Sequence, residues 1–491
     1  MTAAAAAAEA VSAAAAKEDH VILFPFLSKG HTIPLLHLAA ALSSRNILTT
    51  LITTPANVPF CHNYLSSNAP AVTVELLAIP FPCHPDLPAG VESTDSLPNF
   101  SLLPTFIKAT NSLHDPFLRI LRRLLLSPTP PLCLISDYFL GWTLPISSRF
   151  GLPRLVFHGS STFSLSLVKS LWLNIPAVSA AADDTFPIAG APTALRLTMT
   201  DVPEFVRQSV NPLDPLTQFM KSSEEMDGRS WGVIVNSFAE LEPPAYVKLL
   251  ESFYEPVAGG RAWLVGPLSL LTRTEPVDSE CIRWLDRQPV GSVVYVAFGT
   301  QAYVSDEQLD ELAHGLMQAR ARFLWVVRSE RWVAPKGAED LGRIERSWVP
   351  QKDVLHHVAV GGFVSHCGWN SVLEAVSAGV AVLAWPMIAE QCLNAKMVAE
   401  EIGVGIRLRL PIAGGVVERK EVEEGVRELM EGEKGRRARE RVAELAEKAK
   451  AAVVEGGSSY ETLERLLEEL RKVPKAAATM EVDEGEGQVL M

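Results

Sequence analysis

The side chains best suited to binding a phosphate-bearing ligand lie between 361 and 378. A short apolar segment, GGFVS, leads into HCGWNS, and a helical pattern then continues through Ala378. The N-terminus of such a helix presents unpaired backbone N–H groups and a partial positive charge. Gly368 lets the backbone approach a ligand closely, and His366, Asn370 and Ser371 add short polar side chains. These features together predict a diphosphate site.

Two neighbouring residues extend this hypothesis from a diphosphate to a nucleotide. Glu374 lies one helical turn after Asn370 and could accept hydrogen bonds from ribose hydroxyls. Trp348 offers a flat apolar surface on which a uracil ring could stack. Taken locally, the same residues have simpler interpretations, in which Asn370 or Ser371 caps a helix and the tryptophans are core.

A second candidate pair, His31 and Asp137, lies far from this segment in the chain. His31 follows Gly30 in the turn after the strand-like HVILFP, and Asp137 follows the strand-like LCLIS. We expect His31 to act as a base that stays neutral, because a helix N-terminus disfavours the imidazolium. An aspartate on the other ring nitrogen would hold the tautomer and stabilise the imidazolium formed in a reaction. The alternatives are a solvated or structural histidine and a helix cap near Tyr138.

Strands and helices alternate in two successive blocks that could position these residues. Apolar, β-branched runs predict strands in the first block at 20–25, 46–53, 132–136 and 154–157. A second block beginning near Trp263 has predicted strands at 292–298, 323–327, 361–365 and 380–385. Capping boxes are predicted at Ser305 with Gln308 and at Ser458 with Glu461. This alternation predicts an α/β protein with two doubly wound, Rossmann-like domains facing one another across a cleft at the carboxyl ends of their strands.

The length of 491 residues exceeds what one hydrophobic core usually serves, so two domains are expected. The proline and glycines near 256–260 suggest a linker between them. The predicted organisation begins with a disordered leader (1–19), an N-terminal acceptor-binding domain (20–255) and a linker (256–266). A C-terminal sugar-nucleotide domain with terminal helices (267–473) and a disordered tail (474–491) follow.

The composition excludes several classes of partner. A net charge of −13 disfavours binding to nucleic acid or to an anionic membrane surface. The six cysteines lack the spacing of a disulfide framework or a zinc site, and the adjacent pair His356 and His357 is poorly spaced for a metal. The alanine-rich start carries no secretory pattern, and no apolar run is long enough to span a membrane. We therefore expect a cytoplasmic protein with no metal.

The 44 residues from Trp348 to Gln391 closely resemble the signature box of plant secondary-product glycosyltransferases, the UDP-dependent glycosyltransferases of family 1. The match includes the initial W, the Q three residues later, HCGWNSVLE, WP and the final EQ. Further landmarks follow the family order over nearly the whole chain: PFLSKGHTIPLLHLA, ISDYFLGW, VIVNSFAELE and WLDRQPVGSVVYVAFGT.

This resemblance implies the GT-B arrangement and a role for each residue of the box. Uracil would stack on Trp348, the backbone of Val349 would contact it, and Gln351 and Glu374 would hold the ribose. The phosphates would be held by Thr300, His366, Gly368, Asn370 and Ser371. The sugar hydroxyls would be held by Trp369, Glu390 and Gln391. A glutamine at the last position usually accompanies UDP-glucose, whereas a histidine there is associated with galactose.

The resemblance also implies the reaction. His31 and Asp137 match the family's catalytic pair, which would deprotonate a hydroxyl of a small hydrophobic acceptor such as a flavonoid or another phenolic. A single displacement would transfer glucose from UDP-glucose with inversion to a β-glycoside, without a metal or another cofactor. The expected oligomeric state is a monomer.

The acceptor and the position glycosylated are not readable from the sequence. The aromatic residues that could line an acceptor pocket are Phe139, Trp142, Phe157, Phe163, Trp172 and Phe205, although such residues are more often core. Lys29 replaces the glutamine of the commoner QGH form and suggests a subgroup with different acceptors.

Three other functions are alternatives to this hypothesis. A dinucleotide-dependent oxidoreductase would need G-x-G-x-x-G after a first strand, which the sequence lacks. A membrane-anchored glucuronosyltransferase would need a signal and a C-terminal span. A non-catalytic sugar-nucleotide-binding protein remains the alternative, although it would be expected to have lost His31 or Asp137.

Overall fold

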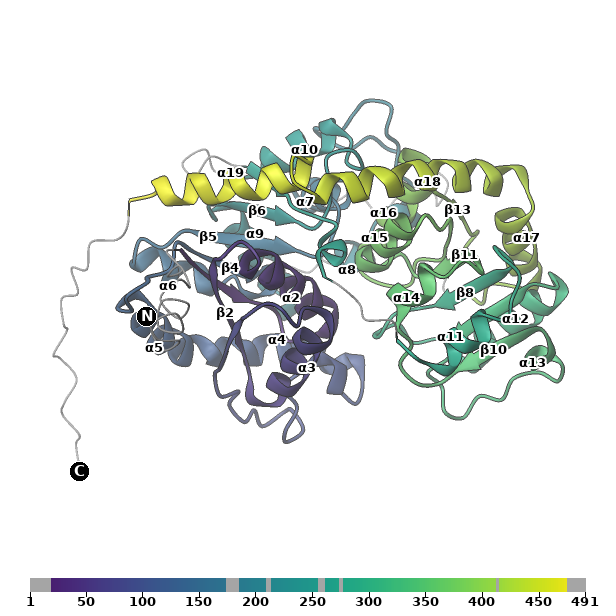
Figure 1. The fold of residues 1–491 in the computed structure, drawn as a ribbon, viewed down its shortest axis with the longest axis horizontal. Helices are drawn as coiled ribbons and strands as arrows, with labels where there is room; N and C mark the ends of the chain where they lie inside the picture. Colours follow the sequence, from purple (N-terminus) through teal and green to yellow (C-terminus); the bar gives the residue numbers. More distant parts are fainter. Residues whose placement is uncertain are drawn as a thin grey trace, which may run out of the picture.

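The protein was analysed as a computed structural model that describes residues 19–173, 185–208, 213–254, 261–272, 277–411 and 415–474. It contains two parallel β-sheets, each covered by helices on both faces (Figure 1). The predicted α/β fold with two Rossmann-like domains is therefore confirmed. The segments predicted to be a disordered leader and tail fall, apart from Asp19 and Pro474, outside the described residues.

The first sheet has seven parallel strands in the order β3-β2-β1-β4-β5-β6-β7. The strand order reverses between β1 and β4, which leaves a crevice at their carboxyl ends where ligands of open α/β sheets bind. All residues of β1, β4 and β5 are buried, because helices cover both faces. The bounds are β1 (His20–Phe24), β2 (Leu48–Thr53), β3 (Glu75–Ala78), β4 (Cys133–Asp137), β5 (Arg154–His158), β6 (Gly232–Val235) and β7 (Arg261–Leu264).

Helices flank both faces of this sheet. Pro34 lies inside α2, and because proline has no N–H, the carbonyl of Gly30 four residues earlier has no intrahelical hydrogen bond from it. The bounds are α2 (Lys29–Ser43), α3 (Val58–Asn68), α4 (Leu103–Ala109), α5 (His114–Leu125), α6 (Thr143–Arg149), α7 (Thr162–Leu173), α8 (Glu204–Gln208), α9 (Pro215–Gly228) and α10 (Pro244–Glu251).

The second sheet has six parallel strands in the order β10-β9-β8-β11-β12-β13, with its own reversal between β8 and β11. Its strands are β8 (Val293–Ala297), β9 (Arg322–Val326), β10 (Gly342–Glu345), β11 (Val360–Ser365), β12 (Val382–Ala384) and β13 (Gly405–Arg407). Its helices are α11 (Glu280–Leu285), α12 (Asp306–Gln318), α13 (Ala338–Leu341), α14 (Gln351–Leu355), α15 (Trp369–Ala378), α16 (Gln391–Lys396), α17 (Arg419–Met430) and α18 (Glu433–Val453), and α19 (Ser458–Lys472) follows.

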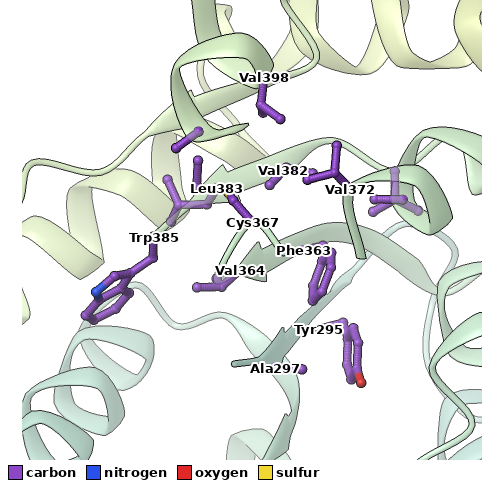
Figure 2. Close-up of a cluster of buried hydrophobic side chains, with 14 of the residues drawn as sticks. Tyr295, Ala297, Phe363, Val364, Cys367, Val372, Val382, Leu383, Trp385 and Val398 are labelled. Atoms are coloured by element: carbon purple, nitrogen blue, oxygen red, sulfur yellow. The ribbon is translucent and has the colours of Figure 1, made fainter. Parts of the chain in front are cut away.

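Bulky side chains fill the space between the second sheet and its helices (Figure 2). Tyr295 of β8 and Phe363 of β11 stack with ring centroids 5.0 Å apart. Val364 and Leu383 are fully buried on the neighbouring strands. This rigid core supports the strand ends from which the ligand-binding loops leave.

The domain boundaries predicted from the sequence need correction. The stretch 256–266, predicted to be the linker, contains β7, which pairs in parallel with β6 as the last strand of the first sheet. Trp263 is therefore buried in the first sheet and does not open the second block. The proline and glycines of this stretch lie outside the described residues, and their composition does not reveal that a strand of the first sheet follows them in the chain.

The last helix, α19, follows the second domain in the chain but packs against the first sheet. Its apolar residues Leu463, Leu466, Leu467 and Leu470 share one core with Val21 and Leu23 of β1. The range 267–473 is thus not one unit, because α18 packs on α15 while α19 packs on β7. In Figure 1 these two helices run along one side of the molecule from the second sheet to the first.

Two predicted capping boxes have different outcomes. Ser305 caps α12 by accepting from the Gln308 backbone N–H, but the Gln308 side chain bonds Val417 instead of completing the box. The box at Ser458 is wrong, because Gly457 occupies the cap position and the Ser458 hydroxyl donates to Glu240.

Candidate active site

A large cavity of about 1740 Å³ lies between the carboxyl ends of the two sheets. The segments that follow β1, β4, β8 and β11 all contribute to its wall. Every residue that the sequence singled out as catalytic or donor-binding lines this cavity, including those separated by more than half of the chain.

His31 and Asp137 are joined across the crevice of the first sheet. His31 lies in the first turn of α2, and its Nδ1 atom is 2.7 Å from Oδ2 of Asp137 at the end of β4. The other oxygen of Asp137 accepts from the Phe139 backbone N–H at 3.0 Å. Asp137 therefore both caps the turn that begins at Tyr138 and bonds His31, since each contact uses a different carboxylate oxygen, and its catalytic role stays a prediction.

The ionisation of His31 differs from the sequence prediction. Burial lowers the pKa of His31, but the charge and hydrogen bond of Asp137 raise it more, so its pKa lies above the ordinary value. The helix N-terminus was predicted to disfavour the imidazolium, but the contact with Asp137 favours it and decides the direction of the shift. Asp137 is almost wholly buried, whereas about a third of the His31 side chain is exposed to the cavity.

The predicted diphosphate site forms at the start of α15. Gly368 is the N-cap residue, and Cys367 before it adopts a φ of 62°, in the left-handed region. The His366 ring lies against both Gly368 and Gly299, since a Cβ atom at either glycine would fall within 2.6 Å of its Nε2 atom. Burial lowers the pKa of His366 to about 4, so the ring is neutral at pH 7. The site thus offers a neutral imidazole beside a helix N-terminus.

Gln351 organises the part of the site predicted to hold the ribose. Its Nε2 atom donates to Glu374 at 2.7 Å and to Ser371 at 2.9 Å. The Tyr295 hydroxyl donates to its Oε1 atom at 3.3 Å, which connects this polar group to the core below. Burial raises the pKa of Glu374, while the Gln351 bond opposes that shift. Ser371 and Glu374 are therefore held in place by one glutamine.

Two residues of HCGWNS bond to the first domain. The Trp369 indole N–H donates to the Asn236 carbonyl at 2.8 Å, and the ring is buried. This indole cannot also donate to a sugar hydroxyl, so any such contact would use the Trp369 backbone. Asn370 donates from Nδ2 to the Gly30 carbonyl at 2.8 Å, next to His31.

At the other end of the cavity, Trp348 is largely exposed, as a stacking surface must be. The Lys29 ammonium lies 5.5 Å from its ring centroid and 5.6 Å from that of Phe60. Lys29, the departure from the commoner motif, thus reaches from the first domain to the predicted uracil platform. Val349 beside Trp348 is buried, which leaves its backbone as the contacting group.

The remaining donor-site residues lie in two loops. Thr300, after β8, lines the cavity, and its carbonyl accepts from Arg328. Glu390 caps the start of α16 and accepts from Asn394 at 3.3 Å. The Gln391 Oε1 atom accepts from the backbone N–H groups of Met387 and Ile388, so the amide nitrogen is the group it can offer to a sugar.

The predicted acceptor pocket is only partly right. Phe139 and Phe205 line the cavity, and Phe139 lies 5.6 Å from the His31 ring, whereas Phe157 borders the cavity but its side chain is buried in the core of the first sheet. Phe163 and Trp172 pack instead with the core of the second sheet, and Trp142 packs among the rings of Phe24 and Phe117. Aromatic character alone could not distinguish the residues that line the cavity from those that pack in the core, because both kinds lie among apolar neighbours in the sequence.

Several residues of the cavity wall were not predicted. Gln301 donates to Ser28 and Thr94, which ties the loop after β8 to the first domain. Tyr138, His158 and Glu224 form a polar corner in the first domain. Such contacts join segments that are distant in sequence, so no pattern within one segment predicts them.

Within the described residues, no group of three or more histidine, cysteine, aspartate or glutamate side chains could hold a metal ion. A search of the same part of the chain for helices long and apolar enough to cross a bilayer found none.

The comparisons with known proteins agree with this geometry. Residues 271–443 match the family model described as UDP-glucoronosyl and UDP-glucosyl transferase. The chain is 38% identical to the scopoletin glucosyltransferase of Nicotiana tabacum, over 92% of this chain and 98% of that one. It is 37% identical to an anthocyanin 3'-O-beta-glucosyltransferase of Gentiana triflora, covering 93% of this chain and 99% of the relative.

Solved structures extend the similarity to the whole fold. A Glycyrrhiza uralensis protein complexed with glycyrrhetinic acid 3-O-monoglucuronide has a TM-score of 0.81 and 28% identity, over 92% of this chain and 96% of that one. A Phytolacca americana protein complexed with UDP-2fluoro-glucose and pterostilbene has a TM-score of 0.77 and 30% identity, over 92% of this chain and all of that one. The chain therefore belongs to the plant UDP-dependent glycosyltransferases of family 1.

Proposed function

We propose that this protein transfers glucose from UDP-glucose to a hydroxyl of a small hydrophobic phenolic acceptor, with inversion to a β-glycoside. The observation that carries this proposal is the 2.7 Å bond between His31 and Asp137 in the same cavity as the start of α15. A base and an anion-binding helix end that face one cavity supply the two groups that a displacement at a sugar carbon requires.

The chemistry assigns a role to each group. The Nδ1–H of His31 donates to Asp137, so Nε2 carries the lone pair that takes the acceptor's hydroxyl proton. The acceptor oxygen then forms a bond to the anomeric carbon while the bond from that carbon to the UDP oxygen breaks. The charge on the departing UDP is stabilised by the N-terminus of α15 and by the side chains of His366 and Ser371. One displacement inverts the anomeric carbon.

The donor assignment rests on the residues of the C-terminal half. Trp348 would stack on uracil, Gln351 and Glu374 would hold the ribose, and Thr300 and Asn370 would assist at the phosphates. Asn370 would have to exchange its bond to Gly30 for a phosphate oxygen. Glu390 and Gln391 would bind the sugar hydroxyls, and Gln391 favours glucose. No metal or other cofactor is part of this proposal.

The acceptor class rests on the cavity wall and on the relatives. Phe139 and Phe205 give the acceptor side an aromatic surface suited to a flat phenolic. The relatives are named for scopoletin, flavonoid and anthocyanin glucosylation. We further infer a cytoplasmic protein, because all six cysteines are free thiols, as is usual in reducing compartments, and a monomer, as the family resemblance implies.

The test is UDP release from UDP-glucose with a panel of flavonoids and coumarins, comparing wild type, His31→Ala and the control His62→Ala. His62 lies exposed on α3, outside the cavity. Acceptor-dependent release should fall by about a hundredfold to ten-thousandfold in His31→Ala, the usual contribution of a general base, while UDP affinity and the control stay unchanged. Equal release in His31→Ala and wild type would remove His31 from the mechanism. UDP binding without release for any acceptor would favour the binding-only alternative.

A further inference from the structure

A buried network of charges and hydroxyls closes the acceptor side of the cavity, and the proposed mechanism does not use it. Its centre is Lys169 of α7, whose ammonium bonds Glu224 and Asp227, both of α9, at 2.6 Å each. Only about 4% of the Lys169 side chain is exposed. A buried cation with two carboxylate partners is costly to assemble, so a functional reason for it is worth seeking.

The two carboxylates are satisfied to different degrees. Asp227 accepts from Lys169, from His158 at 2.9 Å and from the Tyr254 hydroxyl at 2.8 Å, and it is fully buried. These interactions hold the pKa of Asp227 below its usual value, against the effect of burial. Asp227 therefore bonds only to buried side chains of the protein and is not accessible to a ligand in the cavity.

Glu224, in contrast, faces the cavity with acceptor capacity to spare. It accepts from the Tyr138 hydroxyl at 3.0 Å and from Lys169, whereas a carboxylate can accept about four hydrogen bonds. Its side chain is 19% exposed and lines the cavity together with Tyr138 and His158. An acceptor-only group in this position calls for a hydrogen-bond donor on the ligand.

The path from His31 to Glu224 is lined by rings and apolar side chains. Successive ring centroids lie 5.6 Å apart from His31 to Phe139, 5.4 Å from Phe139 to Tyr138 and 4.9 Å from Tyr138 to His158. On α9, Leu216, Met220 and Glu224 repeat every fourth residue, and all three line the cavity. This helix face thus offers an apolar stripe that ends in a carboxylate.

We propose that the Glu224 carboxylate accepts a hydrogen bond from a second hydroxyl of the acceptor, at the end of the molecule opposite the hydroxyl that His31 deprotonates. The substrate class is then a flat phenolic with hydroxyls at both ends, and Lys169 and Tyr138 position the carboxylate. This inference rests on the proposed glucosyl transfer and narrows its acceptor.

The experiment compares two flavones, apigenin and chrysin, which differ only in one hydroxyl on the ring remote from the fused rings. Wild type should have a KM for apigenin about tenfold lower than for chrysin, as expected for one hydrogen bond to a charged group, with similar kcat. The sugar should be attached to the fused rings of apigenin, as checked by mass spectrometry and NMR of the product.

The variants Glu224→Gln and Glu224→Leu then test the residue. Glu224→Gln should lower the KM ratio of chrysin to apigenin, and Glu224→Leu should bring it to about one. Glu225→Gln is the matched control, because Glu225 is the next residue of α9 and its side chain is 64% exposed beside Arg229. Its ratio should equal that of wild type.

Three results would overturn the inference. A wild-type ratio of one excludes the distal hydroxyl contact without any variant, so the test survives even if Glu224→Leu fails to fold. If the KM ratio of chrysin to apigenin stays at the wild-type value in Glu224→Gln and in folded Glu224→Leu, the preference for apigenin comes from another residue. Failure of wild type to release UDP with either flavone or with any member of the flavonoid and coumarin panel would overturn the proposed function and this inference with it, whereas release with other phenolics but neither flavone, or release without preference, overturns the inference alone.

Discussion

At the scale of single residues, the chemistry depends on a balance of opposing effects on His31. Burial alone would keep the ring neutral, whereas the buried carboxylate of Asp137 raises its pKa above the ordinary value. A base with a raised pKa is a stronger proton acceptor, but a larger fraction of it is already protonated at neutral pH. The rate should therefore increase with pH until His31 has lost its proton.

This balance predicts the effect of Asp137→Asn on the pH profile. Without the carboxylate, burial dominates and the pKa of His31 falls, so the rising limb of kcat/KM should move to lower pH. The plateau should also drop by about a hundredfold or more, because the imidazolium loses its charged partner and the asparagine permits the wrong tautomer. Measuring kcat/KM of wild type and variant from about pH 5 to pH 9, a range that brackets the usual histidine pKa, would show whether the rising limb moves. An unshifted limb would show that another group titrates.

At the scale of elements, the start of α15 works only if the backbone and the His366 ring share a very small space. Gly368 has an ordinary φ of −58°, so it is required for close packing and not for an unusual backbone conformation. An added Cβ atom would lie 2.4 Å from Nε2 of His366. The glycine thus keeps the imidazole at the helix end where a phosphate would bind.

The corresponding prediction concerns Gly368→Ala. The methyl group should displace His366 and weaken UDP binding by about fivefold to a hundredfold, the usual range for overpacking. In a His366→Ala background the same methyl group has no ring to displace and should cost little. Isothermal titration of UDP into the four proteins of this cycle would measure the coupling, and additive losses would contradict the steric explanation.

At the scale of the whole molecule, the chain returns from the second sheet to the first. The helix α18 packs on α15, and α19 then buries four leucines against the first sheet. Direct bonds across the cavity add to this strap, among them Trp369 to Asn236 and Gln301 to Ser28. The distance between the base and the diphosphate site is therefore set by the last helix as well as by the loops.

We expect Leu466→Ala to destabilise the protein by about 2–5 kcal/mol, the usual cost of emptying a buried leucine site. The loss should affect the first sheet most, because Leu466 shares a core with Val21 and Leu23. Urea unfolding followed by tryptophan fluorescence would measure the change. Glu468→Ala, on the exposed face of the same helix, serves as the control. Equal stability of the two variants would mean that α19 is only loosely attached.

The sequence by itself determined the fold class and which residues gather at the predicted donor half of the site. Apolar strands alternating with amphipathic helices leave few arrangements other than parallel sheets, and the carboxyl ends of parallel strands collect the loops that follow them. His366, Gly368, Ser371 and Glu374 lie close together in the chain, so the geometry of one helix start relates them. Local rules are sufficient for such a site.

Only the tertiary structure decided what depends on contacts between distant segments. It assigned β7 and α19 to the first sheet, raised the pKa of His31 through Asp137, and directed the Trp369 indole to Asn236. It also separated the aromatic residues that face the cavity from those that pack in the core. Each of these outcomes is set by the burial and charge of neighbours that are remote in sequence, and no pattern within one segment carries that information.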